Sequence, residues 1–216
     1  MTARTFTDVS DLLPPEVHDG YAFAGGWFDL DRDGWLDLYV VHDFGRSFPN
    51  RLLWNREGEL VLDDGDVVSE SHSILDYLDS LVPAAERLFP VAEPTRHRAL
   101  RVATLATGLC EQAVSVFYER RFHKVSAEAL IGRRSMQMRG TAAALEADRA
   151  ARPGAYWFGE RIGHADIAVA AMARFTSEAL PGLIPIADHP ALADHCRRLE
   201  ALPVFQAISQ PFMPPA

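Results

Sequence analysis

The sequence has little of three things: cysteine, basic charge and long apolar runs. Its 216 residues include two cysteines, Cys110 and Cys196, both inside helical patterns, so buried thiols are expected rather than a disulfide framework. The first residues lack the apolar stretch of a signal peptide. The longest apolar run, residues 167–172, is far too short to cross a bilayer. These absences predict a cytoplasmic chain with no membrane partner.

Positive charge is scarce where negative charge is concentrated. Residues 1–68 hold 14 Asp and Glu against 5 Arg, whereas residues 69–216 hold equal numbers of acidic and basic residues. The formal net charge of -9 therefore arises in the first third of the chain. Such a segment suits cations, and without a basic face to offset phosphate repulsion, nucleic acid is disfavoured as a partner. The asymmetry also indicates two parts with different roles.

Hydrophobic periodicity changes near the same place. Before residue 69 short strand-like runs alternate with turns at Gly25-Gly26 and Asp33-Gly34, and beyond it the apolar residues recur at helical spacing. The expected strands are 21–24, 36–41, 51–54, and a hairpin of 59–62 with 67–68. The expected helices are 69–79, 95–123, 126–149, 164–180, 190–201 and 204–209.

Residues 29–37 form an acidic loop with the spacing D-x-D-x-D-G-x-x-D. Alternate residues of a tight loop point their carboxylates at one centre, and a hard dication such as Ca²⁺ takes about six to eight oxygen ligands. The expected ligands are the carboxylates of Asp29, Asp31, Asp33 and Asp37 with the main-chain carbonyl of Trp35. A strand follows the loop, which excludes an EF-hand. The alternative is a solvated acidic turn that holds no ion.

The flanks of this loop carry a first resemblance. Residues 26–28 before it and residues 38–41 and 50–52 after it resemble the FG-GAP/VCBS type of β-propeller blade repeat, over about residues 6–58. The resemblance implies a single blade-like β unit that binds calcium through the loop. Blades need neighbours to bury their faces, and the sequence shows no second copy.

The rest of the chain, about residues 60–216, resembles the glutathione transferase family. The resemblance rests on residues 60–78, 157–170 and 198–205. It implies the remnant of a thioredoxin-like sheet followed by an all-α glutathione-transferase C-terminal bundle, so that the expected fold class is α+β. The domains implied are the blade-like segment 1–58, a partial thioredoxin-like hairpin and helix 59–80, and the all-α domain 81–216. The simplest account is a chimera joined near residues 57–60.

The same resemblance assigns a glutathione site. It implies that Glu70 and Ser71 hold the γ-glutamyl end of glutathione, the co-substrate. A helix that begins there offers free amides and a positive dipole end to a carboxylate, while Glu70 offers an anion to an ammonium group. The alternative is a helix N-cap with Ser69 or Ser71 as the capping residue.

Four further residues receive roles by resemblance. Ser115, Tyr118 and Arg121 lie on the long helix that lines the cleft for the electrophile in this family, although an aromatic on a helix more often packs in a core. Asp166 corresponds to the acid that returns a hydrogen bond to the start of its helix, a structural cap. Gly163 stands where the family has a hydroxyl residue.

Two features of the family are missing. Gly58 occupies the position of a cis-proline that pairs with the cysteinyl part of glutathione, and Gly lacks the ring that makes a cis peptide accessible. No strand–Ser/Cys/Tyr–helix unit in residues 1–58 could lower the thiol pKa of glutathione, so the catalytic residue stays unknown.

Three functions remain open at this point. The first is conjugation of glutathione to small electrophiles, an activity that would be lost if the replaced N-terminal half is essential. The second is a calcium-binding interaction module on a helical dimerisation scaffold, since members of this family usually pair as homodimers. The third is a catalytically empty chimera with a folded helical bundle.

Overall fold

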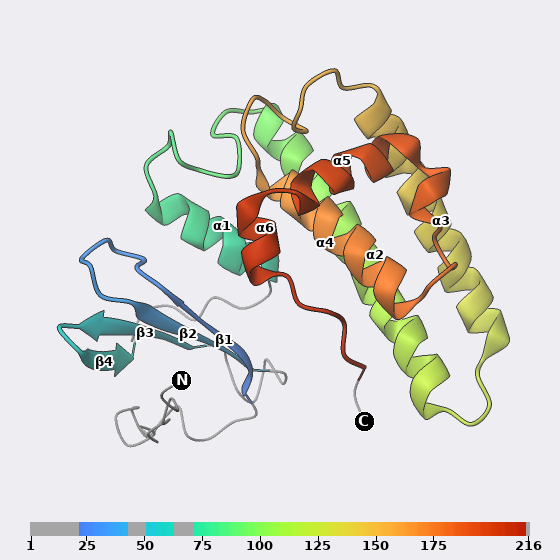
Figure 1. Ribbon diagram of the computed structural model, residues 1–216, viewed down its shortest axis with the longest axis horizontal. Coiled ribbons are helices and arrows are strands. Elements are labelled where there is room, and N and C mark those ends of the chain that lie inside the picture. The colour runs from blue at the N-terminus through green and yellow to red at the C-terminus, as the bar shows by residue number, and fades with distance from the viewer. Residues whose placement is uncertain (1–21, 43–50, 63–70, 215–216) are drawn as a thin grey trace, which may run out of the picture. The chain divides into compact units, whose positions relative to one another are not determined.

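The computed structural model describes residues 22–42, 51–62 and 71–214. The chain divides into two compact units, Met1–Leu81 and Val82–Ala216. The first unit contains a four-stranded antiparallel sheet and one helix, and the second is a helical bundle (Figure 1). The α+β fold class expected from the sequence is confirmed, with a small sheet followed by helices.

The sheet is a meander in which each strand pairs with the next along the chain. Its order is β1-β2-β3-β4, and every pairing is antiparallel. The strands are β1 (Ala22–Phe28), β2 (Asp37–His42), β3 (Arg51–Arg56) and β4 (Glu59–Leu62). The acidic loop is the connection between β1 and β2, and the register Phe28↔Asp37 fixes its two ends side by side.

A two-residue turn joins β3 to β4. Arg56 pairs with Glu59, and the residues between them, Glu57 and Gly58, both have positive φ, at 55° and 98°. Two successive positive φ values are the signature of a type I′ hairpin, whose twist matches that of the strands. The Oδ1 of Asn55 accepts the Gly58 N–H at 2.8 Å. The expected boundary between residues 58 and 59 therefore lies inside a continuous hairpin.

The expectation of a turn at Gly25-Gly26 is wrong. Both glycines lie within β1, where they pair with Val40 and Tyr39 across the sheet. Glycine is compatible with a strand when its neighbour supplies the ladder of main-chain hydrogen bonds, and here β2 does so. The expected strand 67–68 lies outside the described residues.

The core of the sheet is small. Leu38, Val40 and Leu53 are buried together, and Leu60 packs against them. Full burial of one such side chain contributes about 1.5–3 kcal/mol, so a cluster of this size gives the sheet a modest hydrophobic stabilisation. Trp27, on the same unit, remains 56% exposed.

The first unit ends with α1 (Ser71–Leu81), and the second contains the remaining helices. These are α2 (Thr95–Phe122), α3 (Glu128–Ala150), α4 (His164–Ala179), the short 3-10 helix η3 (Ile186–Asp188), α5 (Pro190–Glu200) and α6 (Pro203–Ile208). Each helix expected from the apolar spacing is present, with ends that differ by at most two residues; residues 69 and 70, the expected start of the first helix, lie outside the described residues.

The bundle is built around α4, which packs against α2 and α5 (Figure 1). The buried positions of α2 recur every three or four residues, and several of them are alanines that let the two helix axes approach closely. On α4, Val169, Ala170 and Met172 are buried, in keeping with its nearly all-round apolar sequence. Among the described residues, no helix is both long and apolar enough to cross a membrane.

The segment that precedes α2 is attached to the start of α4. The main-chain carbonyl of Leu88 accepts the His164 N–H at 3.1 Å, and the Phe89 ring lies 4.3 Å from the His164 ring, centroid to centroid. Arg161 also donates a hydrogen bond to the carbonyl of Ala85. Residues 82–94 are therefore part of the helical unit.

Candidate functional site

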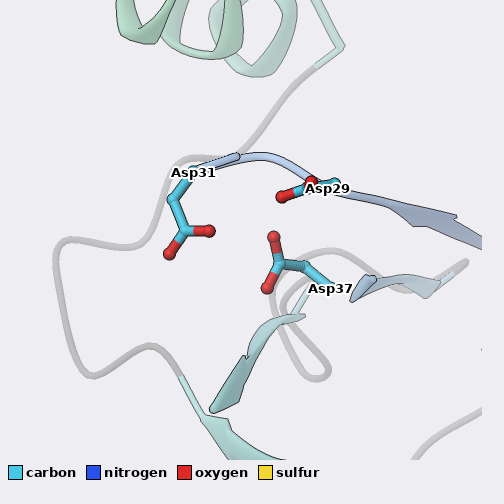
Figure 2. A group of neighbouring side chains, drawn as sticks. All are labelled: Asp29, Asp31 and Asp37. Carbon is cyan, nitrogen blue, oxygen red and sulfur yellow. The ribbon is translucent and has the colours of Figure 1, made fainter. Parts of the chain in front are cut away.

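The acidic loop brings three of its four predicted carboxylates together. Ligand oxygens of Asp29, Asp31 and Asp37 all lie within 4.8 Å of one another. Figure 2 shows the three carboxylates gathered around one space, with Asp29 and Asp31 on the loop and Asp37 at the first residue of β2. Positive φ at Arg32 (63°) and Gly34 (94°) produces the tight turns that fold the loop back on itself.

Asp37 is fully buried and ties the loop to the sheet. Its Oδ2 accepts the Leu30 N–H at 2.8 Å, and its Oδ1 accepts the Asn55 N–H from β3 at 2.9 Å. A buried carboxylate is stable only when such donors replace water. Asp37 therefore has a structural role that does not require an ion.

Asp33 and Trp35 are placed differently from the prediction. The Oδ1 of Asp33 accepts the Trp35 N–H at 2.8 Å, and its Oδ2 lies 3.7 Å from the guanidinium of Arg56. Arg56 also forms an ion pair with Asp31. The loop charge is thus partly neutralised from within the unit by a cation that the sequence pattern did not reveal. The structure does not bring Asp33 into the carboxylate cluster.

The proposed glutathione residues lie at the edge of the described chain. Glu70 falls outside the described residues, and α1 begins at Ser71, whose side chain is likewise not described. The first turn of α1 contains no acidic residue. The positive dipole end of the helix is therefore not offset by an acid within that turn.

The three predicted cleft residues lie toward the carboxyl end of α2. Ser115 is half-buried, whereas Tyr118 and Arg121 are exposed. The Tyr118 ring stacks on Phe122 with a centroid separation of 5.4 Å, and the Arg121 guanidinium lies 5.9 Å from the centroid of the Phe122 ring. Ser115, Tyr118 and Phe122 are three, four or seven residues apart and so share one face of the helix. Arg121, three residues after Tyr118, lies at the side of that face.

Asp166 connects the start of α4 to the loop before it. Its Oδ2 accepts the Gly163 N–H at 2.8 Å, the reach-back contact of a capping box. Gly163 has no side chain to return the bond. The Oδ1 accepts the Trp157 N–H at 2.8 Å and lies 3.1 Å from the Nε2 of His195, without the alignment of a hydrogen bond. These contacts connect the start of α4 to the preceding loop and to α5.

Asp148, whose role the sequence did not reveal, is a second carboxylate that holds the loop before α4. The Oδ1 of Asp148 accepts the indole N–H of Trp157 at 2.8 Å and the Nε–H of Arg152 at 2.6 Å. Burial alone would raise the pKa of Asp148, but these hydrogen bonds and the charges of Arg152 and Arg101 outweigh it and hold the pKa below its usual range. The i, i+4 spacing of Asp148 and Arg152 was the available sequence signal.

Neither thiol is suited to act as a nucleophile. Burial, with a smaller effect from Glu111, raises the pKa of Cys110 to about 11. Burial, with a smaller effect from Glu200, raises the pKa of Cys196 to about 12. The thiolate is the reactive form of cysteine, so a raised pKa disfavours reaction at either thiol. Cys196 is buried in the core and Cys110 packs against it partly buried, so neither forms a disulfide framework.

A comparison with protein families finds a match to part of the helical unit. Residues 128–198 match the family model of the glutathione S-transferase C-terminal domain. No curated protein sequence gives a significant match to the chain. The bundle from α3 to α5 is therefore of the glutathione transferase type.

Solved structures of glutathione transferases share the fold more widely. A glutathione S-transferase from Methylobacterium radiotolerans, in complex with glutathione sulfonate, is 27% identical with a TM-score of 0.62, over 77% of this chain and 76% of its own. A glutathione transferase family member from Pseudomonas fluorescens Pf-5, with bound S-(propanoic acid)-glutathione, is 29% identical with a TM-score of 0.59. The match covers 70% of this chain and 75% of that protein.

A third similar structure belongs to an enzyme with a different name. Maleylpyruvate isomerase from Pseudomonas aeruginosa PAO1 is 25% identical with a TM-score of 0.56, and the match covers 73% of this chain and 77% of the isomerase. The chain is thus glutathione-transferase-like in fold, and its similar structures include proteins crystallised with glutathione derivatives.

Proposed function

We propose that this chain binds glutathione at the amino end of α1 and conjugates it slowly to small electrophiles. The observation that carries the proposal is the similarity to glutathione-transferase structures that hold glutathione derivatives. The match of residues 128–198 to the C-terminal domain of the same family supports it independently.

The chemistry at the start of α1 supports the binding step. A helix of 11 residues that begins at Ser71 leaves its first amides without intrahelical partners, and these amides favour a carboxylate. The Ser71 hydroxyl adds a donor, and Glu70 supplies an anion for the ammonium group of the γ-glutamyl end. Glutathione carries both groups on one carbon atom, which suits this pair.

Slow turnover is proposed because two contributions to thiol activation are missing. Gly58 lies in a type I′ turn, so its backbone does not offer the cis-proline arrangement that pairs with the cysteinyl group. The sequence of residues 1–58 also offers no strand–Ser/Cys/Tyr–helix unit that could lower the pKa of the glutathione thiol. Glutathione would then react mainly through the small thiolate fraction present in solution, since the neutral thiol is a poor nucleophile.

The test is a calorimetric titration of the full chain with glutathione, and with glutathione sulfonate. The substitution Ser71→Ala is expected to weaken binding by about tenfold, the effect of roughly 1.4 kcal/mol. Ser73→Ala is the matched control, because Ser73 lies two residues further along α1, which turns its side chain away from that of Ser71, and it is exposed. Conjugation of 1-chloro-2,4-dinitrobenzene measures turnover in parallel.

The outcomes separate binding from catalysis. Binding that Ser71→Ala weakens and Ser73→Ala leaves unchanged supports the site. If neither glutathione nor glutathione sulfonate gives a heat of binding, the proposed function is rejected altogether. Rapid conjugation would reject only slow turnover and would point to an activating group in the residues that are not described.

A second function is favoured by the convergence of Asp29, Asp31 and Asp37. We propose that this loop binds Ca²⁺ in the manner of an FG-GAP/VCBS-type blade. Three carboxylates within 4.8 Å supply part of the oxygen shell that the ion needs, and Ca²⁺ would offset their mutual repulsion. Trp35 and Asp33 would complete the shell after Asp33 leaves Arg56.

Thermal unfolding with calcium and with chelator tests this second proposal. Calcium is expected to raise the melting temperature of wild type, because an ion that binds only the folded state stabilises it. Asp31→Asn, at an exposed loop position, is expected to abolish the rise without loss of the sheet. Identical melting curves with calcium and with chelator would reject the calcium site.

A homodimer is also proposed, since the glutathione-transferase fold implies one. Exposed apolar side chains on α2 and α3 support it, among them Phe122 (55%) and Met136 (68%). Light scattering on the purified chain would give the mass of a dimer. The mass of a monomer at every accessible concentration contradicts it.

A further inference from the structure

The end of the helical unit where α2 meets α3 carries a charge opposite to that of the chain as a whole. Residues 119–134 hold five Arg and Lys against two Glu, in a chain whose formal net charge is -9. They comprise the last turn of α2, the connecting turn 123–127 and the first two turns of α3, and are called the α2–α3 tip. Figure 1 shows this tip as one end of the helical unit.

The two acids of the tip serve its own structure. The Oε1 of Glu119 accepts the Ala127 N–H at 2.8 Å, and its Oε2 lies 3.0 Å from the Nδ1 of His123. The Glu119 side chain is only 15% exposed, so its carboxylate faces the connecting turn more than the water. Glu128 lies in the first turn of α3, where an acid offsets the positive end of the helix dipole.

Three cations of the tip have no such use. Arg120, Lys124 and Arg133 are exposed, and within the described part of the chain none of them forms an ion pair. A rise of about 1.5 Å per residue places Arg133 within about 8 Å of the start of α3 along the helix axis. Charges act together over about that distance at physiological ionic strength. The three cations therefore add to one positive field at the tip.

Apolar side chains are exposed among these cations. Val125, in the connecting turn, is 87% exposed, and Leu130 on α3 is 42% exposed. Val125 directly follows Lys124, so a cation and a nearly free apolar side chain share one short turn. Removing apolar surface from water is favourable, and a partner that is anionic at its surface and apolar just beneath satisfies both groups.

From this charge and this exposure, we infer that the α2–α3 tip binds peripherally to an anionic lipid bilayer. The headgroup phosphates match the cations, and the layer beneath them receives Val125 and Leu130. The expectation of no membrane partner rested on the lack of a segment that could cross a bilayer, whereas a peripheral contact needs only such a surface. The inference does not rest on glutathione binding, because the proposed glutathione site contains no residue of the tip.

Sedimentation of the full chain with lipid vesicles tests the partner. One set of vesicles mixes phosphatidylglycerol with phosphatidylcholine, and the other is phosphatidylcholine alone. A chelator is present throughout, so that calcium cannot bridge the acidic loop to the lipid. The anionic vesicles are expected to bind at least about tenfold more tightly, and added salt should weaken this binding because it screens the charges. Equal binding to both sets, or no binding to the anionic one, overturns the inference.

Paired substitutions test whether the cations of the tip carry the contact. Lys124→Gln combined with Arg133→Gln is expected to weaken binding to the anionic vesicles by about tenfold or more, since each cation near such a surface contributes about fivefold. Arg98→Gln combined with Arg197→Gln is the matched control. It changes the net charge by the same amount at exposed positions outside the tip and should leave binding unchanged. An equal loss in both variants overturns the inference.

A substitution of the exposed valine distinguishes a bilayer from other polyanions. Val125→Ser is expected to weaken vesicle binding by about fivefold, because less apolar surface leaves water on contact. Val91→Ser, at a valine that is 55% exposed outside the tip, should have no effect. Binding that needs the cations but ignores Val125 is what an acidic protein or a nucleic acid would also give, and it overturns the lipid partner. Thermal melting and light scattering establish that each variant is folded and has the mass of wild type.

Discussion

The indole N–H of Trp157 and the carboxylate of Asp148 form a 2.8 Å hydrogen bond that joins the loop before α4 to the last turns of α3. Trp157 is almost completely buried, and its main-chain N–H is bonded to Asp166 in addition. Two acids from different helices therefore hold one tryptophan, one at its backbone and one at its ring.

We expect Asp148→Asn to destabilise the helical unit. The change weakens hydrogen bonds to a charged acceptor, and the loss should be about 1–3 kcal/mol in the free energy of unfolding. Chemical denaturation in neutral solution measures it. Asp188→Asn, at an exposed position of η3, is the matched control and should change stability little. Equal stability of both variants and wild type would contradict the role of Asp148.

The effect of Asp148 should also depend on pH in a defined direction. Its pKa is lowered in the folded state, so its stabilisation is present above the unfolded pKa of about 3.9 and is lost as the pH falls through the folded value. The stability difference between wild type and Asp148→Asn should therefore shrink in acid. A difference that grows on acidification would refute this assignment.

Gly163 and Gly132 should respond oppositely to alanine. A Cβ at Gly163 would stand 2.7 Å from the main-chain oxygen of Leu88, whereas a Cβ at Gly132 in α3 meets no heavy atom within 4 Å. Gly163→Ala should lower stability by about 1–3 kcal/mol because backbone must shift. Gly132→Ala should raise it by about 0.5–1 kcal/mol, the helix preference of alanine over glycine. Thermal and chemical unfolding of the two variants measure both changes, and shifts of the same sign would disprove this contrast.

The two cysteines should be slow to alkylate. With pKa values of about 11 and 12, the thiolate fractions of Cys110 and Cys196 in mildly alkaline solution are lower than that of a free cysteine by about a hundredfold or more. Mass spectrometry after iodoacetamide treatment measures the rates, and unfolding in urea should restore them. Rapid labelling of either thiol in the native chain would show that its burial is not maintained.

Arg56 should oppose calcium at the acidic loop. Arg56→Gln removes the cation paired with Asp31, so the calcium-dependent rise in melting temperature should increase. Arg51→Gln on the same strand is the control, and it should behave as wild type. If Arg56→Gln abolishes the rise, the arginine assists the ion rather than competing with it.

The helices were predictable because their apolar residues recur at one spacing over many turns. The stripe on α2 was expected over 95–123 and is observed over Thr95–Phe122. Strand ends were harder to place. Gly25 and Gly26 have a local preference for turns, but they are held in β1 by pairing with β2, a contact that no local pattern encodes.

The acidic loop illustrates what spacing can and cannot predict. The alternation of aspartates correctly indicated a convergence of carboxylates, because a tight loop directs alternate side chains inward. It did not reveal that Asp33 instead accepts a hydrogen bond from Trp35 and faces Arg56. Arg56 is 23 residues or more from both aspartates in sequence, so only the β3–β4 hairpin brings it near.

The bond between Leu88 and the first amide of α4 bears on how the helical unit can be isolated. A fragment that starts at Thr95, where the first long helix begins, would lack Leu88 and Phe89. The His164 N–H would then lose its acceptor, and the His164 ring would lose its contact with Phe89. A fragment that starts at Val82 keeps residues 82–94 and both of these contacts. A fragment of the helical unit made for expression should therefore begin at Val82, because residues 82–94 stabilise the start of α4 although they contain no long helix.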